Sequence, residues 1–200
     1  EDWEDEFVPP QGLRYPVAAL DQLLRLVLSE RAMSLIGHVY LLPDARIQEL
    51  IAEPARVYEV IDSSYNEPGQ GFVDLDKAWH CLHYLLTGSA QAGNGPLSFI
   101  LQGGTPVGDE DLGGYGPARV LRPLEAAALA DALAPLTQQQ LLARFDLKKL
   151  ENLNVYPGRW SELNLRSEYE LGYYFGPFLD LKRITARAKD ERLGLIVWIA

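Results

Sequence analysis

An apolar run occupies residues 35–42 of the chain, Leu35-Ile36-Gly37-His38-Val39-Tyr40-Leu41-Leu42. A second run, near the C-terminal end, is Leu195-Ile196-Val197-Trp198-Ile199. Short apolar runs of this kind are typical of buried strands. We therefore expect a small mixed β-sheet with strands at residues 35–42 and 194–199 near its centre.

Helical patterns outnumber strands in the sequence between these two runs. The expected helices begin at Pro43, Pro54, Asp74, Pro123, Thr137 and Leu171. Further short strands are expected at 97–101, where a helical turn is the alternative, and at 118–121. Thr137 and Gln140 form a capping-box pattern, and Gly88 is placed to end the helix expected over 74–88. This pattern predicts an α+β domain in which several helices cover the sheet.

Residues 1–32 differ in character from the rest of the chain. They contain an acidic run, a Pro-Pro linker and an amphipathic helical pattern over 17–28. The only methionine, Met33, follows them. We expect 1–32 to be a leader, possessing a helix that lies in a groove of the domain or of a partner, and 33–200 to be the domain.

Composition restricts the classes of function. The formal net charge is −10, and the 18 Lys and Arg residues are scattered, which argues against a nucleic-acid-binding surface. An acidic surface suits a basic protein partner, although acidic charge more commonly serves solubility alone. One cysteine in 200 residues is typical of a reducing compartment. There is no signal-peptide pattern and no stretch typical of a membrane span, so we expect a cytoplasmic protein.

Catalytic and metal-binding motifs are missing from the sequence. There is no phosphate-binding glycine loop, no nucleophile elbow and no zinc-protease motif. His80 and His83 have a spacing that occurs in metal sites, but no third ligand is apparent, so no metal or cofactor is expected. Cys81 is interpreted as a small buried hydrophobe, and the carboxylates 109–111 as solvated groups of a glycine-rich loop.

Aromatic residues are dense between 156 and 178. They are Tyr156, Trp160, Tyr169, Tyr173, Tyr174, Phe175 and Phe178. The two phenylalanines are expected in the core. Because tyrosine combines a large apolar ring with a polar tip, some of these tyrosines are candidates for a pocket or a binding face.

Three motifs resemble the YfbM-like family of small bacterial proteins. They are Met33-Ser34-Leu35-Ile36-Gly37, the pattern Asp-Lys-x-Trp-x-x-Leu-His-x-x-Leu-Thr-Gly over 76–88, and Asn154-Val155-Tyr156-Pro157-Gly158. The resemblance covers 33–200. It implies a compact α+β cytoplasmic bacterial domain and no particular reaction, and it draws attention to Asp76, Trp79, His83 and Tyr156.

Two functions of different classes fit these observations. The first is a non-enzymatic protein-binding module, such as an inhibitor or an immunity-type partner of a basic protein; an acidic, tyrosine-bearing surface patch would favour it. The second is a small-ligand-binding protein or enzyme with a pocket around Trp79, His83 and Tyr156. The candidate binding residues are Asp76, Trp79, His83, Tyr156, Trp160, Tyr173 and Tyr174.

Overall fold

A five-stranded sheet organises the part of the chain that the computed structural model describes, which is residues 34–66, 69–163 and 168–200. The strand order is β2-β1-β5-β4-β3. The strands are β1 (Gly37–Leu42), β2 (Phe72–Asp76), β3 (Thr105–Pro106), β4 (Arg119–Leu121) and β5 (Gly194–Ile199). The predicted α+β class is confirmed. The described strand pairs are all antiparallel, whereas the sequence was expected to give a mixed sheet.

The two apolar runs pair with each other in the middle of the sheet, as predicted. β1 and β5 are aligned over six residue pairs, from Gly37 opposite Ile199 to Leu42 opposite Gly194. Beyond the ladder, Ile36 N donates to Ala200 O at 2.8 Å, and Ala200 N donates back to Ile36 O at 3.0 Å. The first and the last strand of the described residues are therefore neighbours in the interior of the sheet.

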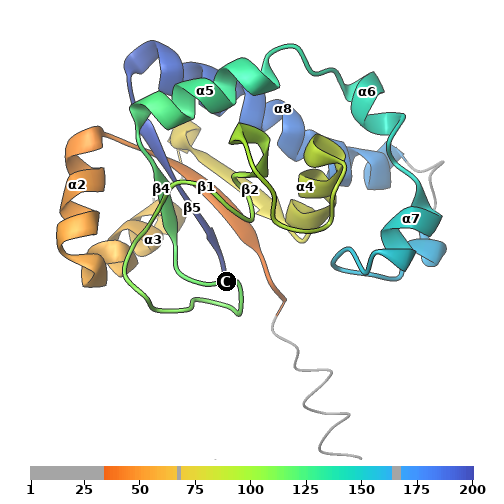
Figure 1. Ribbon diagram of the computed structural model, residues 1–200, viewed down its shortest axis with the longest axis horizontal. Coiled ribbons are helices and arrows are strands. Elements are labelled where there is room, and N and C mark those ends of the chain that lie inside the picture. The colour runs from red at the N-terminus through yellow and green to blue at the C-terminus, as the bar shows by residue number, and fades with distance from the viewer. Residues whose placement is uncertain (1–33, 67–68, 164–167) are drawn as a thin grey trace, which may run out of the picture. The chain divides into compact units, whose positions relative to one another are not determined.

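Each face of the sheet is covered by helices (Figure 1). One face carries α2 (Asp44–Ala52) and α3 (Val57–Asn66), and the other carries α4 (Trp79–Thr87), α5 (Pro123–Leu133) and α8 (Glu168–Glu191). Side chains of β5 alternate between the two cores, with Val197 in the larger and Ile196 in the smaller. The remaining short helices are α6 (Gln138–Leu142), α7 (Leu147–Asn152), η1 (Pro54–Arg56), η2 (Gly69–Gly71), η3 (Pro96–Ser98) and η4 (Trp160–Glu162).

Most of the predicted helix boundaries are confirmed. Thr137 and Gln140 form the predicted capping box at the start of α6. Gly88 ends α4 with φ of 78°. α8 continues through Pro177 over 24 residues. Among the described helices, none combines the length and apolar character that crossing a membrane requires. The predicted leader over 1–32 lies outside the described residues.

Two predicted elements are wrong. Residues 74–76 belong to strand β2 and not to a helix, because the alternation of buried Val73 and Leu75 with exposed Asp74 fits the strand period. Residues 97–101 form a helical turn, which was the alternative to the preferred strand. There Arg119 donates to the carbonyl oxygens of Phe99 and Ile100 at 2.8 and 2.6 Å, so these acceptors are occupied by a side chain.

Gly194 is expected to be irreplaceable at the start of β5. A Cβ at this position would collide with the backbone oxygen of Leu121 and with Ile47. We expect Gly194→Ala to lower the free energy of unfolding by about 2 kcal/mol, because the close-packed sheet must move apart. Gly172→Ala is the control, since an added Cβ meets nothing within 4 Å there; it should stabilise α8 by about 0.5–1 kcal/mol. Urea unfolding measures both, and equal effects would contradict this account.

Candidate functional site

The predicted pocket residues Trp79 and Tyr156 lie together and pack ring to ring. Their centroids are 5.6 Å apart, and Tyr115 contacts Trp79 edge-on at 4.7 Å. Trp79 is fully buried, and its Nε1 donates to Leu35 O at 3.0 Å. The hydroxyl of Tyr156 accepts a hydrogen bond from Leu35 N at 3.1 Å. These contacts hold the chain entering β1; ligand binding by the two rings stays a prediction.

His80 and His83 are buried and bind main-chain atoms. His80 accepts from Tyr156 N at Nδ1, at 3.0 Å, and its Nε2 lies 2.8 Å from Ala90 O, which fixes the proton on Nε2. His83 Nε2 lies 3.0 Å from Gln91 O. Burial lowers the pKa of both rings. Among the described residues, no group of three or more His, Cys, Asp or Glu is placed to hold a metal ion.

The other candidate residues form two pairs that meet where the Tyr173 and Tyr174 rings contact each other edge-on, with centroids 4.9 Å apart. Asp76 lies beside Tyr173, where burial and then the Asp76 carboxylate raise the pKa of the Tyr173 hydroxyl. That hydroxyl accepts from Lys77 N at 3.2 Å. Trp160 and Tyr174 are buried, and their ring centroids are 5.1 Å apart. The structure therefore places these side chains in the core and its margin, and their part in binding stays a prediction.

Two further predictions concern single side chains. Cys81 is completely buried, as expected of a small hydrophobe, and burial raises the pKa of its thiol. A thiol with a raised pKa is a poor nucleophile at neutral pH. The side chain of Tyr169 lies outside the described residues.

Sequence reasoning missed a polar aromatic cluster on the α3 side of the sheet. His38 Nε2 lies 2.8 Å from the Tyr65 hydroxyl, and the His38 ring packs at 5.0 Å from Trp198 and 5.5 Å from Phe72. Asp74 Oδ1 lies 3.6 Å from His38 Nδ1. His38 and Trp198 alternate onto this face from neighbouring strands, and Tyr65 comes from α3. Alternate side chains of a strand lie on opposite faces of the sheet. Applying this alternation to both central strands could have indicated that His38 and Trp198 share a face.

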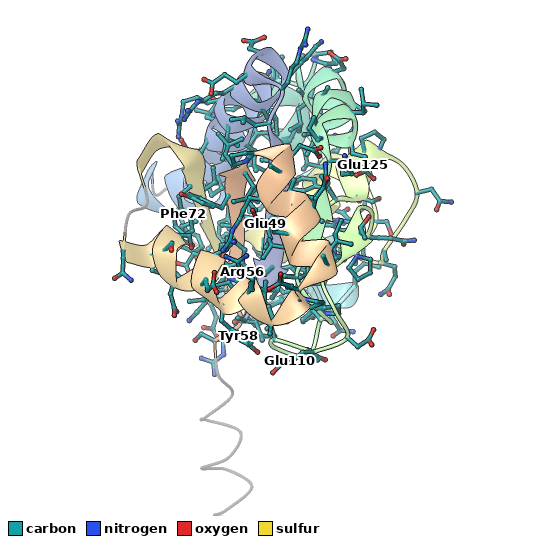
Figure 2. The ribbon with its side chains drawn as sticks, turned by 90° about the vertical axis from the view of Figure 1, so that its left-hand side faces the viewer. Glu49, Arg56, Tyr58, Phe72, Glu110 and Glu125 are labelled. Atoms are coloured by element: carbon teal, nitrogen blue, oxygen red, sulfur yellow. The ribbon has the colours of Figure 1, made fainter. Side chains whose placement is uncertain are left out.

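The exposed side of α3 carries tyrosine and carboxylate groups together. Tyr58, Asp62 and Tyr65 are spaced four and three residues apart, so they share one side of the helix. Tyr58 is 43% exposed and Tyr65 is 50% exposed. A hydrogen bond from the Tyr58 hydroxyl to Glu110 raises the pKa of Tyr58. Figure 2 shows Tyr58 and Glu110 at one edge of the surface that α2 and α3 present. We call Tyr58, Asp62, Tyr65 and Glu110 the tyrosine face.

Ion pairs that link α2, η1 and α3 neutralise the charges next to the tyrosine face. Arg46 contacts Glu49 and Glu59, each at 2.7 Å, and Arg56 contacts the same two carboxylates at 3.4 and 3.2 Å. Glu49 and Arg56 lie between the two helices in Figure 2. Two arginines thus balance two glutamates, and Asp62 and Glu110 contribute the negative charge of the face.

A second surface feature is an apolar groove between α6 and α8. The cavity has a volume of 520 Å³. It is lined by Gln138, Gln139, Leu142, Leu171, Gly172, Phe175, Gly176 and Leu179. None of these lining residues is ionisable, so the groove offers shape and apolar surface but no acid–base chemistry.

The domain is similar to a known protein family and to a protein of solved structure. A family model described as "Domain of unknown function (DUF1877)" matches residues 33–198. Protein YfbM of Escherichia coli (strain K12) is 27% identical over 158 residues, covering 77% of this chain and 89% of the relative. The crystal structure of YfbM, described as a protein of unknown function, superposes with a TM-score of 0.59 at 24% identity. That match covers 82% of this chain and 99% of the other, and shows a shared fold.

The buried histidines predict a loss of stability in mild acid. Burial lowers the folded-state pKa of His38, His80 and His83 below the ordinary value of 6.5. The unfolded chain therefore binds protons first as the pH falls through about 6.5, and the free energy of unfolding decreases. Urea unfolding at pH 7.5, 6.5 and 5.5 measures this slope.

A histidine variant tests the assignment of that slope. His83→Gln should reduce the pH dependence between 7.5 and 5.5, because it removes one titrating group, whatever its effect on stability at pH 7.5. Exposed carboxylates titrate mainly below this range. An unfolding free energy that is constant from pH 7.5 to 5.5 would contradict the buried, neutral state of the rings.

Proposed function

The chain belongs to the family described as a domain of unknown function (DUF1877), in agreement with its resemblance to the YfbM-like family, and we propose that it is a non-enzymatic protein-binding module for a basic partner. The observation that carries the proposal is the tyrosine face, where two half-exposed tyrosines share one side of α3 with Asp62 and lie beside Glu110 of the loop after β3. The sequence-based hypothesis named a strongly acidic, tyrosine-bearing exposed patch as the feature that would favour it, and evenly mixed surface charge as the feature that would count against it.

The chemistry of the tyrosine face suits a partner rich in Lys and Arg. Tyrosine rings supply large contact areas and are enriched where binding energy concentrates. The carboxylates of Asp62 and Glu110 are complementary to cationic side chains, and the formal charge of −10 accelerates the approach of a basic protein. Aromatic rings with acidic neighbours also hold cations over the ring face.

Tyr65 is held in place before any partner arrives. Its hydroxyl binds His38 Nε2 at 2.8 Å, and its ring packs edge-on against His38 at 5.2 Å and Trp198 at 6.4 Å. A side chain fixed in this way loses little conformational entropy on binding. The buried histidine thus makes a rigid anchor out of an exposed tyrosine.

An inhibitory or immunity-type role is consistent with this chemistry. A module of this kind acts by covering a basic surface of another protein and needs no catalytic group of its own. The side chains that could have formed a catalytic site, His83 and Cys81, are enclosed in the core and have lowered and raised pKa values respectively.

Capture by the full chain tests the proposal. Immobilised chain is incubated with bacterial extract in parallel with Tyr65→Ala and Asp62→Ala variants, and captured proteins are identified and quantified. We expect a basic protein whose capture falls at least about 10-fold with Tyr65→Ala, because truncation of an interface tyrosine costs about 2 kcal/mol. Capture should also weaken as the salt concentration rises.

Two control variants lie on the other side of the sheet. Leu179→Ala shortens a half-exposed leucine of α8, and Asp190→Asn removes an exposed charge from the same helix. Both should capture the partner as the unchanged chain does. Loss with Leu179→Ala and none with Tyr65→Ala would overturn the proposal and transfer binding to the apolar groove.

A further inference from the structure

A small cavity lies next to the tyrosine face, under the loop that follows β3. Its volume is 140 Å³. It is lined by Pro54, Ala55, Val57, Val107, Gly108, Asp109, Glu110, Leu112 and Ala118. Binding sites for drug-sized ligands occupy about 300–1,000 Å³, so this cavity takes only one extended side chain. We call it the 107–112 pocket.

The walls of the 107–112 pocket are apolar and fixed. Val57, Val107 and Ala118 are buried and belong to the smaller core between the sheet and α3. Gly108 has φ of +69°, and a Cβ there would lie 2.8 Å from Pro54 Cβ. The loop therefore closes directly against η1, and the pocket retains its shape without a ligand.

Two of the three loop carboxylates are available to a ligand. Asp111 accepts hydrogen bonds from the backbone N–H groups of Gly113 and Gly114, which employs it in holding the loop. Asp109 and Glu110 line the pocket and are exposed. Glu110 raises the pKa of the nearby Tyr58 hydroxyl, so the carboxylate lies beside a tyrosine of the tyrosine face.

We propose that the 107–112 pocket binds one lysine side chain of the basic partner, with the aliphatic stem between Val57, Val107 and Ala118 and the ammonium group at Asp109 and Glu110. This inference rests on the proposed function and identifies the kind of residue that the partner supplies. The argument is complementarity of charge and shape: a narrow apolar cavity with carboxylates among its lining residues matches a flexible four-carbon stem with a compact terminal charge. The planar, bidentate head of arginine matches two carboxylates of successive residues less well.

Amide NMR of the full chain tests the pocket with a simple probe. The probe is Nα-acetyl-lysine methylamide, and the controls are the norleucine and arginine analogues. We expect saturable shifts at Gly108, Glu110 and Leu112 with a Kd on the order of 1–10 mM, as befits one side chain. The neutral norleucine analogue should bind at least about 5-fold more weakly, because it lacks the charge that the carboxylates attract. Arginine binding as strong as lysine binding would overturn the assignment to lysine.

Two variants distinguish the carboxylates from the walls. Asp109→Asn combined with Glu110→Gln should weaken lysine binding at least about 5-fold while leaving the norleucine analogue unchanged. Ala55→Phe, at an exposed position of the lining, should block both analogues. Asp190→Asn, on α8, is the matched charge control and should change neither. Shifts that persist in Ala55→Phe would place the probe elsewhere and refute the pocket.

Failure of this inference is distinguishable from failure of the proposed function. Capture that depends on Tyr65 without probe binding at Gly108 and Leu112 would refute the lysine pocket alone. Probe binding at the pocket without capture of a basic protein would refute the binding module and retain a lysine-selective site.

Discussion

The antiparallel pairing of β1 with β5 is the interaction on which the rest of the structure depends. All six residues of β5 are buried, and alternate side chains enter the two cores on opposite faces of the sheet. Neither layer of helices would have a sheet face to pack against without this ladder, because side chains of β1 and β5 enter both cores. The close contact of Gly194 with Leu121 and Ile47 shows how little space the two layers leave at the start of β5.

The two layers are unequal, and this inequality bears on where the proposed binding surface lies. The larger core holds α4, α5 and α8 and encloses Trp79, His83 and Trp160. The smaller core is covered by two short helices, so rings from the sheet, such as Trp198, lie close to exposed residues of α3. Because only one layer of short helices covers this core, a tyrosine of α3 can be exposed to solvent and still contact buried side chains of the sheet. That arrangement explains why the tyrosine face lies on α3 and away from the aromatic-rich segment 156–178.

Much of the fold follows from local sequence patterns, whereas the site does not. Apolar runs predicted β1 and β5, Pro123 the start of α5, the Thr137 capping box α6 and Gly88 the end of α4, because these signals act between near neighbours. Residues 97–101 were misassigned because Arg119, some twenty residues further on, occupies their carbonyl groups. The tyrosine face joins α3 to a loop around Glu110, and His38 reaches Tyr65 across 27 residues. Such contacts depend on tertiary packing, which one sequence does not display.

The hydrogen bonds between Ile36 and Ala200 determine how the domain responds to mechanical force. A pull applied at these two residues loads the β1–β5 ladder from one end, so its hydrogen bonds break one after another and do not share the load. Zipper-like opening of this kind requires little force in comparison with shearing of the same strands. Because these are the central strands, peeling them apart separates both cores at once.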